Sequence, residues 1–555
     1  MTQGMFFESF WPEYNGKMAL KAEVGLCDDP VNRIQEPLIL NFTEDGNHAV
    51  CGLPMSGKST FLQTAVYSLL KKYSPQYLNV YILDFSSRML EPFEKAPQVG
   101  GILYENDLDN IGKLFHMLEK RLKERKKLFR GGNFSQYTAK HGPVCPAILV
   151  VIDHMAAFRE KTSAEYDDIL LRFSRECASN GIYLLISGAS YGISEIPSRL
   201  KDNIRKNICM ELQDKYQYAD IFNTVKIDTV PESGIPGRGL VKTDDGILEF
   251  QTCLASEVQD DYSRLEEIQE ECRRMDQKWM GKRAKSIPVI PEKPVWSNFV
   301  KWDEIEADFQ DKRKLPIGYV YETAEPYNID LRNMYCFIIS GRARTGKTNL
   351  LKIAMRSAAR KKAELVVIEF EGEELKAEAE DLGARYIATC EDYFQLMMGL
   401  FPEIKERNTE KKRMLQQMAD IEELFDQLSE KKPYFLFISD LAQFSQIMHG
   451  KEGEERGCAG FTSNFFEKGD SQNVYFIACM NPDKRLAVQN QKVYQTFTDW
   501  KTGIHLGGNC DGQTYLDFSK LSYNQLKEAL PAGQGYVSML QEEGATRIVV
   551  PQAKG

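Results

Sequence analysis

Short apolar runs recur along the chain, separated by longer segments in which apolar residues return at helical spacing. Runs such as "YLNVYILDF" (77–85) and "PAILVVID" (146–153) have the length of strands buried on both faces of a sheet. Between them, "LDNIGKLFHMLEKRLKERKKLFRG" (108–131) has helical periodicity and a glycine just past its end. Strands that alternate with helices predict an α/β fold with mostly parallel sheets flanked by helices.

The same order of runs occurs twice in the chain. In sequence order, the matching pairs are "YLNVYILDF" with "AELVVIEF" (363–370), "PAILVVID" with "PYFLFISD" (433–440), "IYLLISGAS" (182–190) with "VYFIACMNP" (474–482), and "IPGRGLV" (235–241) with "LPAGQGYV" (530–537). A repeat of this kind changes the domain assignment. We expect a tandem duplication with domains at residues 1–280 and 281–555, joined near the proline-punctuated segment "IPVIPEKPVW".

Each repeat contains one match to G-x-x-x-x-G-K-[ST], in "GLPMSGKS" and "GRARTGKT". The glycines let backbone N–H groups converge on a phosphate, the next helix offers its N-terminal dipole, and the lysine and hydroxyl serve phosphate and magnesium. ATP and Mg²⁺ are therefore the expected cofactors. The expected nucleotide-binding residues are Gly52, Met55, Ser56, Gly57, Lys58, Ser59, Thr60 and Asp153 in the first repeat and Gly341, Arg344, Thr345, Gly346, Lys347, Thr348, Asn349 and Asp440 in the second.

A glycine turn that holds no ligand is the alternative reading of both loops. It carries more weight for the second loop, where Arg342 and Arg344 either assist the phosphates or fill an emptied site. The expected magnesium ligands are the loop hydroxyls and the aspartates that end the next apolar strand, namely Ser59, Asp153, Thr348 and Asp440.

The residue after each of these aspartates bears on hydrolysis, because a glutamate usually stands there to polarise the attacking water. The first repeat has His154 and the second has Leu441. A neutral histidine can accept a proton, although a structural role is the alternative, and leucine cannot accept one. We expect nucleotide binding in at least one repeat, with slow or absent turnover in the first and none in the second.

Other polar residues recur near the expected strand ends. Asp84 and Glu369 end matching strands, where loop capping and ligand contact are both possible. Candidates for a polar sensor of the terminal phosphate are Ser187, Ser190 and Asn481, and candidates for an arginine finger are Arg199, Arg205 and Arg238.

Composition narrows the class of protein. The 555 residues contain 70 Lys and Arg against 80 Asp and Glu, a formal charge of −10 that disfavours a nucleic-acid partner. The 12 cysteines form no Cys-x-x-Cys pair, which indicates neither a zinc site nor a redox pair. No apolar run is long enough for a membrane span, and the N-terminal "MTQGMFFESFWPEYNG" lacks the pattern of a signal peptide.

Several of these features together resemble the motor domains of the FtsK/SpoIIIE class. They are the phosphate loop, "YILDF", the helix containing "KRLKERKKLF", the strand that ends in Asp153 and the glycine-rich "PGRGLV". Two such domains joined by "IPVIPEKP", both without the hydrolytic glutamate, resemble the membrane-anchored ATPases of type VII secretion.

The resemblance implies two tandem RecA-like P-loop NTPase domains, the second and third ATPase domains of a longer protein. It also implies a homo-hexamer at the cytoplasmic face of the bacterial membrane, in contact with other membrane subunits of the secretion machine. The expected substrates are small helical-hairpin proteins, and the expected use of nucleotide is structural or regulatory.

Two alternatives stay open at this point. A DNA translocase of the same class is disfavoured by the acidic balance, the missing glutamates and the lack of a basic tail after "VVPQAKG". A nucleotide-free scaffold, in which both loops are relics, predicts no stabilisation by Mg-ATP.

Overall fold

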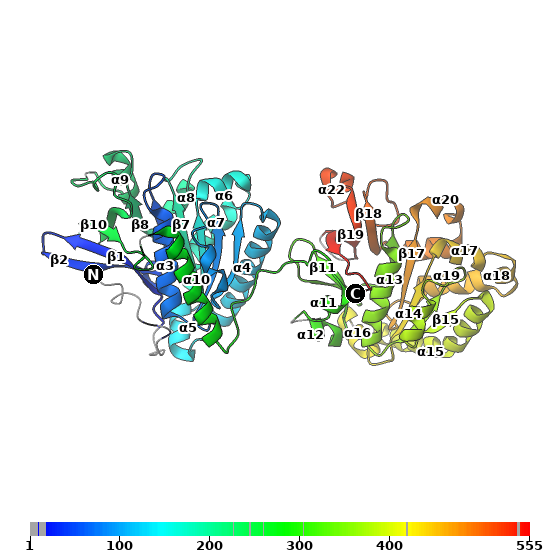
Figure 1. The fold of residues 1–555 in the computed structure, drawn as a ribbon. Coiled ribbons are helices and arrows are strands. Elements are labelled where there is room, and N and C mark those ends of the chain that lie inside the picture. The colour runs from blue at the N-terminus through cyan, green and yellow to red at the C-terminus, as the bar shows by residue number, and fades with distance from the viewer. Residues whose placement is uncertain are drawn as a thin grey trace. The chain divides into compact units, whose positions relative to one another are not determined.

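The computed structural model describes residues 9, 11, 18–225, 227–243, 246–258, 260–302, 305–417, 420–540 and 544–554. Most of the N-terminal segment in which no signal peptide is expected lies outside these residues. The chain divides into two compact units, Met1–Pro288 and Val289–Gly555, which we call unit 1 and unit 2 (Figure 1). Among the described residues, no helix has both the length and the apolar character that a membrane crossing requires.

Unit 1 is built on a ten-stranded sheet with the strand order β2-β1-β10-β9-β8-β3-β7-β6-β4-β5. Its strands are β1 (Lys21–Asp29), β2 (Ile34–Asn41), β3 (Asn47–Cys51), β4 (Leu78–Asp84), β5 (Val99–Tyr104), β6 (Ala147–Asp153), β7 (Ile182–Gly188), β8 (Ile204–Met210), β9 (Arg238–Thr243) and β10 (Gly246–Thr252). The strands from β8 to β5 in this order run parallel, and β9, β10, β1 and β2 extend the sheet in antiparallel fashion. The sheet is therefore mixed.

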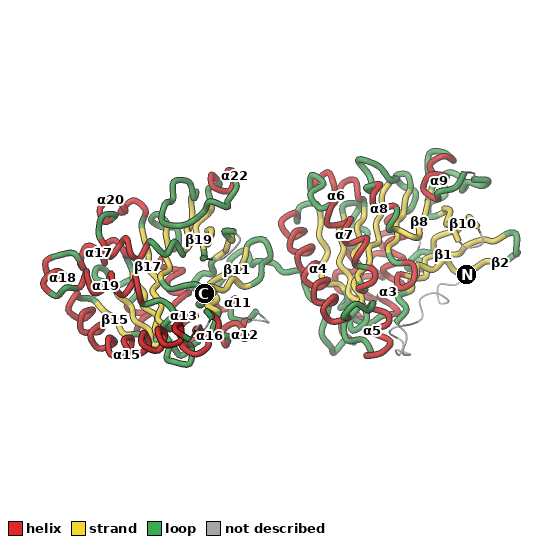
Figure 2. Tube along the Cα trace, turned by 180° about the vertical axis from the view of Figure 1, so that it is seen from behind, coloured by secondary structure: helices red, strands yellow, loops and turns green. Residues whose placement is uncertain are grey.

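Helices cover both faces of this sheet (Figure 2). They are α2 (Phe42–Asp45), α3 (Lys58–Lys72), α4 (Leu108–Phe129), α5 (Phe134–His141), α6 (Met155–Lys161), α7 (Asp167–Glu176), α8 (Ser198–Lys201), α9 (Lys215–Phe222) and α10 (Asp261–Lys278), with the short 3₁₀ turns η1 (Glu91–Lys95) and η2 (Ala178–Asn180). One apolar core contains residues of α3 and α10, and the other contains residues of α4, α6 and α7. Because α10 buries Cys272 and Met275 in the first core, the charged helix before the junction belongs to unit 1.

Unit 2 repeats the same topology, in the order β12-β11-β20-β19-β18-β13-β17-β16-β14-β15. Its strands are β11 (Lys314–Val320), β12 (Pro326–Asp330), β13 (Cys336–Ser340), β14 (Glu364–Ile368), β15 (Arg385–Ile387), β16 (Tyr434–Ile438), β17 (Val474–Met480), β18 (Gly503–Gly508), β19 (Leu530–Ser538) and β20 (Thr546–Val549). Each strand takes the place of the unit 1 strand numbered ten lower. The predicted tandem α/β architecture is confirmed.

The helices of unit 2 also lie in two layers, with α13 on one face and α15, α17, α19 and α21 on the other. They are α11 (Trp296–Phe299), α12 (Ile305–Gln310), α13 (Lys347–Arg360), α14 (Lys376–Asp381), α15 (Cys390–Gln416), α16 (Ile421–Leu428), α17 (Leu441–Met448), α18 (Lys451–Glu455), α19 (Cys458–Lys468), α20 (Arg485–Val488), α21 (Lys492–Thr498) and α22 (Tyr523–Lys527), with the 3₁₀ turn η3 (Pro482–Lys484). Matching elements thus occupy matching layers in the two units.

A buried arginine ties matching parts of each unit together. In unit 1, Arg125 of α4 donates to the carbonyl oxygens of Asn180 (2.7 Å), Gly181 (2.9 Å) and Pro146. In unit 2, Arg407 of α15 donates to the carbonyl oxygens of Gln472 (2.8 Å) and Lys432 (2.8 Å). The carbonyls belong to the segments that enter the two central strands on that side. Each arginine therefore satisfies backbone acceptors that burial would otherwise leave without donors.

Candidate functional site

The phosphate loop of unit 1 connects the buried strand β3 to the helix α3 at the carboxyl edge of the parallel strands. Gly57, the residue before the helix, has φ = 100°, and a Cβ added there would lie 2.6 Å from the backbone nitrogen of Gly237. A glycine is required for both reasons. The Ser56 hydroxyl is buried and has no hydrogen-bond partner in the part of the chain that the structure describes. The loop thus has the conformation and an unused polar group that a bound anion would need.

Lys58, the first residue of α3, turns back over this loop. Its ammonium donates to the carbonyl oxygens of Gly52 and Leu53, both at 2.7 Å. Burial lowers the pKa of Lys58, because the charged form loses solvation. An anion in the loop would compensate for that loss.

Ser59 and Asp153 lie in contact at the end of β6. The Ser59 hydroxyl donates to Asp153 Oδ2 at 2.7 Å. The Ser187 hydroxyl donates to the other carboxylate oxygen and accepts a hydrogen bond from the backbone N–H of His154 at 2.9 Å. Asp153 is 1% exposed, and the ion pairs among the described residues do not include it. Mg²⁺ prefers oxygen ligands, and the Asp153 carboxylate and the Ser59 hydroxyl supply them. Because no side-chain cation pairs with this carboxylate among the described residues, these residues fit the metal.

His154 caps the N-terminus of α6. It has φ = 65° and is the N-cap of α6, where its Nδ1 accepts a hydrogen bond from the N–H of Ala157 at 3.2 Å. The lone pair of Nδ1 is therefore occupied, and in the neutral ring the proton lies on Nε2. In this geometry neither ring nitrogen is free to accept a proton from water. The predicted catalytic role of His154 gains no support from its contacts.

The phosphate loop of unit 2 has the same backbone but different side-chain contacts. Gly346 has φ = 103°, and Lys347 donates to the carbonyl oxygen of Arg342 at 2.6 Å. The Thr348 hydroxyl lies 3.4 Å from Glu374 Oε2, and the hydrogen bonds of Asp440 among the described residues do not include it. The two expected magnesium ligands of unit 2, Thr348 and Asp440, therefore do not form the hydrogen bond that their counterparts form in unit 1.

Asp440 already has a full set of partners. Its Oδ1 accepts from the N–H groups of Ala442 (3.0 Å) and Gln443 (3.2 Å), as the N-cap of α17, and its Oδ2 accepts from Lys484 Nζ at 2.6 Å. A carboxylate that caps a helix and pairs with an ammonium is already neutralised, so Mg²⁺ would have to displace the lysine. The residues of unit 2 do not fit the metal.

The remaining residues of the second loop divide between backbone roles and exposure. Thr345 Oγ1 donates to the Arg342 carbonyl at 2.9 Å, and Arg344 is exposed with φ = 64°. The Asn349 side chain donates to the carbonyl oxygen of Pro551 at 2.9 Å and accepts from the N–H of Ala553 at 2.8 Å. The amide of Asn349 thus holds the C-terminal segment in place.

Other predicted residues of unit 1 lie at the same edge. Met55 is 92% exposed with φ = 65°, and Thr60 is half-buried in the first turn of α3. Gly52 donates its N–H to the carbonyl oxygen of Gly188 at 3.1 Å, which fixes the start of the loop against the end of β7.

Asp84 and Glu369 have the same structural role in the two units. Asp84 accepts hydrogen bonds from the N–H groups of Ser86 (3.1 Å) and Leu90 (3.3 Å), and Glu369 accepts from that of Leu375 (3.1 Å). Burial, with a smaller contribution from Asp153 beside it in the sheet, raises the pKa of Asp84. Of the two possible roles, loop capping is the one that these contacts support.

The sensor candidates lie at or after the carboxyl ends of β7 and β17, whereas the arginine candidate Arg205 lies at the amino end of β8. Ser187 contacts Asp153, Ser190 is half-buried, and Asn481 caps η3 by accepting from the N–H of Asp483 at 3.1 Å. The candidate arginines Arg199 and Arg205 are exposed, and Arg238 lies 3.5 Å from both Glu232 and Glu249.

Three charged residues that sequence analysis does not single out lie at these sites. They are Glu374, Lys484 and Glu195, which accepts a hydrogen bond from the N–H of Ala189 at 3.1 Å in the loop after β7. Glu195 lies in the segment after β7, and Lys484 lies in the segment after the matching strand β17. A comparison of the charged residues in these two segments of the sequence would have found Glu195 and Lys484.

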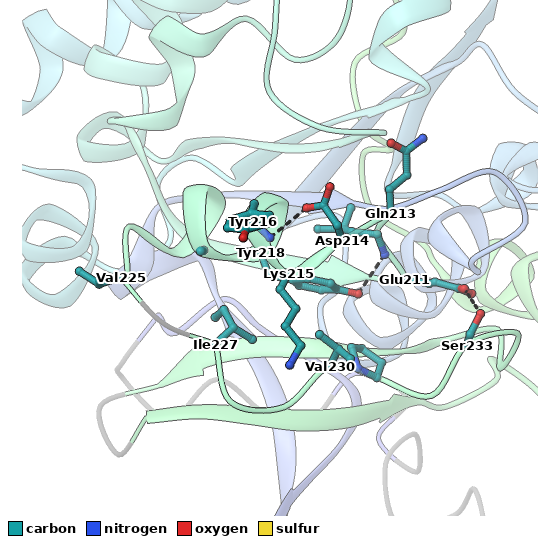
Figure 3. Close-up of a pocket in the computed structure, with 13 residues that line it drawn as sticks. Glu211, Gln213, Asp214, Lys215, Tyr216, Tyr218, Val225, Ile227, Val230 and Ser233 are labelled. Atoms are coloured by element: carbon teal, nitrogen blue, oxygen red, sulfur yellow. Dashed lines mark hydrogen bonds between the residues drawn. The ribbon is translucent and has the colours of Figure 1, made fainter.

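A cavity of about 620 Å³ lies between α9 and the segment that contains Val225, Ile227, Val230, Pro231 and Ser233 (Figure 3). Tyr218 lines it and accepts a hydrogen bond from the N–H of Leu212 at 2.9 Å, while Tyr216 and Val225 are exposed. The backbone of Glu211, which also lines the cavity, accepts from the N–H of Leu53 at 2.8 Å. The cavity and the phosphate loop are therefore joined through one strand end.

Known proteins share parts of this sequence and this fold. A family model described as the FtsK/SpoIIIE family matches residues 15–145. The chain is 24% identical over 476 residues to the type VII secretion system protein EssC of Staphylococcus aureus (strain MRSA252), covering 85% of the chain and 30% of that protein. It is 27% identical over 339 residues to the ESX secretion system protein EccC of Geobacillus thermodenitrificans, covering 60% of the chain and 22% of that protein. The chain thus spans less than a third of these relatives.

Solved structures with the same fold cover nearly the whole chain. EssC (ATPases 2 and 3) from Geobacillus thermodenitrificans has a TM-score of 0.73 at 21% identity, covering 98% of both chains. Thermomonospora curvata EccC (ATPases 2 and 3) in complex with a signal sequence peptide has a TM-score of 0.60 at 20% identity, covering 98% of this chain and 94% of that one. The chain therefore contains a domain of the FtsK/SpoIIIE family and is a homologue of the type VII and ESX secretion proteins EssC and EccC.

Proposed function

We propose that the chain is the ATP-binding, substrate-engaging segment of the motor for type VII protein secretion. Unit 1 binds Mg-ATP, and both units use nucleotide mainly to hold or regulate structure, with weak hydrolysis in unit 1 and none in unit 2. The full protein works at the cytoplasmic face of the membrane as a hexamer with other subunits of the machine.

The contact between Ser59 and Asp153 carries the nucleotide part of this proposal. It brings a hydroxyl and a buried carboxylate to 2.7 Å beside a phosphate loop whose lysine is in place. Ser59 and Asp153 would hold Mg²⁺, which when bound would neutralise charge on the phosphate oxygens. Lys58 would bind the same phosphates, and the N–H groups at the start of α3 would orient them.

Weak turnover follows from what surrounds Asp153. No glutamate follows it, and the Nδ1 of His154 accepts from the N–H of Ala157. Without a group that orients or deprotonates water, the bound nucleotide is retained, and its binding energy stabilises the folded unit. In unit 2 the corresponding position is Leu441, which is 0% exposed and cannot approach water.

The proposed substrates are secreted small helical-hairpin proteins. Their engagement is supported by the relatives, which are secretion proteins, and by the fold shared with an EccC chain in complex with a signal sequence peptide.

The test is calorimetric titration with ATP and magnesium of the chain and of the variants Lys58→Ala, Lys347→Ala and the double variant. Loss of one binding event in Lys58→Ala is the expected result, because its ammonium is the phosphate ligand of unit 1. No heat in the unaltered chain would reject nucleotide binding and favour the scaffold alternative. Phosphate release at saturating ATP then measures turnover. We expect the same rate in the unaltered chain and in the His154→Asn variant.

A further inference from the structure

Unit 2 offers a positively charged side chain where unit 1 offers a magnesium site. Asp153 is the last residue of β6, and Asp440 follows the end of β16 as the N-cap of α17, where its Oδ2 accepts from Lys484 Nζ at 2.6 Å. Asp153 has hydroxyl donors, Ser59 and Ser187, in the same position. The two carboxylates therefore differ in whether a cation from the chain already neutralises them.

The fold delivers Lys484 to this place. The lysine ends the 3₁₀ turn η3, which follows β17, and β17 lies in the sheet between the loop strand β13 and the aspartate strand β16. Asn481 fixes the turn, because its side chain accepts from the N–H of Asp483 at 3.1 Å and its carbonyl accepts from the N–H of Lys484 at 3.0 Å. A lysine at this position therefore reaches Asp440 from the end of the strand that lies next to the loop strand.

The loop after β7 in unit 1 has a carboxylate but no lysine, whereas the turn after β17 carries Lys484 beside Asp483, which lies 3.7 Å from Arg342. The carboxylate is that of Glu195, which accepts from the N–H of Ala189 at 3.1 Å. Glu195 cannot neutralise the negative charge of Asp153 or of a bound polyphosphate, so in unit 1 a divalent cation has to do so. An ammonium at the matching edge of unit 2 makes that cation unnecessary.

The second magnesium ligand is also diverted in unit 2. The Thr348 hydroxyl faces Glu374 Oε2 at 3.4 Å, and the loop itself adds the exposed cations Arg342 and Arg344 to Lys347. Lysine and arginine side chains can take the place of a metal in neutralising transferred or bound phosphate groups. The anion expected here is one with several adjacent charges.

We propose that unit 2 binds the polyphosphate of a nucleotide without a divalent cation, with Lys484 performing at Asp440 the charge neutralisation that magnesium performs at Asp153. This inference rests on the proposed use of nucleotide by the chain. It gives the two units different metal requirements: unit 1 responds to magnesium and ATP together, and unit 2 responds to ATP alone.

The test measures ATP binding by calorimetry in magnesium and in EDTA, with one site removed at a time. The variant Lys58→Ala leaves unit 2, where the affinities in the two buffers should agree within about threefold. The variant Lys347→Ala leaves unit 1, where EDTA should weaken binding by about tenfold or more. Circular dichroism checks that each variant is folded.

A second set of variants tests Lys484 itself. In the Lys58→Ala background, Lys484→Gln should weaken binding in EDTA by about tenfold and in magnesium by less, whereas Lys484→Arg should retain binding in both buffers. The control is Lys492→Gln on α21, which removes a lysine with an equally short ion pair, to Glu467 at 2.6 Å, and should change neither affinity.

Each outcome decides between the two proposals. Binding by the Lys58→Ala variant only when magnesium is present would overturn the metal-free site and leave nucleotide use by unit 2 standing. No binding by this variant in either buffer would overturn both for unit 2. Equal effects of Lys484→Gln and Lys492→Gln would remove Lys484 from the site.

Discussion

Ser59 and Asp153 are 94 positions apart in the chain, and the hydroxyl of one donates to the carboxylate of the other at 2.7 Å. This hydrogen bond joins the first turn of α3 to the end of β6, and it brings together a phosphate loop and the carboxylate that we propose as a magnesium ligand. The corresponding residues of unit 2, Thr348 and Asp440, bond to Glu374 and Lys484 instead. Two repeats with one topology thus differ at the contact that matters for magnesium.

Replacing Ser59 with alanine should weaken Mg-ATP binding at unit 1 by about tenfold, because one charge-assisted contact of the metal is lost. Binding in EDTA should change little. Calorimetry in the Lys347→Ala background measures both values, and Thr348→Ala in the Lys58→Ala background is the matched control, for which we expect no metal-specific loss. An equal loss in both buffers would indicate that the Ser59 hydroxyl supports the loop rather than the metal.

Variants of His154 should separate its capping role from catalysis. His154→Ala removes the acceptor for the Ala157 N–H and keeps a non-glycine residue at φ = 65°, so it should lower the free energy of unfolding of unit 1 by about 1 kcal/mol. His154→Asn keeps an acceptor and tolerates positive φ, and should retain stability. Denaturant unfolding measures the difference. A loss of ATP turnover in the asparagine variant would contradict this reading and return His154 to catalysis.

The buried residue His505 should make the free energy of unfolding of unit 2 depend on pH. This residue is 5% exposed, and burial lowers its pKa to about 4. Its Nδ1 lies 3.0 Å from the Ser340 hydroxyl, which also contacts the hydroxyl of Tyr515 at 2.7 Å. The unfolded chain binds a proton near pH 6.5 and the folded chain only near pH 4, so stability is present above pH 6.5 and is lost as the pH falls across this window, by roughly 3 kcal/mol in total.

The variant His505→Gln should flatten this pH dependence. Denaturant unfolding at pH 7, 6 and 5 gives the slope for the parent and for the variant. His116→Gln, at an exposed position of α4 in unit 1, serves as the control. An unchanged slope in the His505 variant would assign the pH dependence to other groups.

The two buried arginines should be equivalent tests of the repeat. Arg407→Met removes the donors to the carbonyl oxygens of Gln472 and Lys432 and should destabilise unit 2 by about 3 kcal/mol. Arg125→Met should act in the same way on unit 1, and lysine at either position should give an intermediate loss, because it lacks the planar fork. Hydrogen exchange measured peptide by peptide would show which unit loses protection. Protection lost first in the unaltered unit would contradict the assignment.

The central parallel strands could be predicted from the sequence, and the edges of the sheets could not. β4 and β6 are buried along nearly their whole length, so their apolar runs are continuous and recognisable. β2 has four exposed residues at its start, and its pairing with β1 depends on tertiary contacts rather than on its own pattern. The prediction of mostly parallel sheets is therefore confirmed, and the antiparallel strands at one side of each sheet are the part that the sequence pattern did not reveal.

The candidate sites show the same division. The loops, Lys58, Ser59 and Asp153 follow from local motifs and from strand ends. The partner of Asn349 is Pro551, 202 positions away, and the partner of Asp440 is Lys484, 44 positions away. No local pattern encodes these contacts, because the fold alone decides which side chains meet.

Because Leu441 is buried and His154 is exposed, the two units differ in the folding cost of placing a glutamate after the strand-end aspartate. His154 is exposed, so a single change to glutamate there adds a charged group in water at little folding cost. Leu441 is 0% exposed within an apolar core, and glutamate there would place an unpaired charge among hydrocarbon side chains. Under the proposed function, the apolar core of unit 2 therefore opposes a glutamate at position 441, whereas unit 1 accepts a glutamate at the exposed position 154.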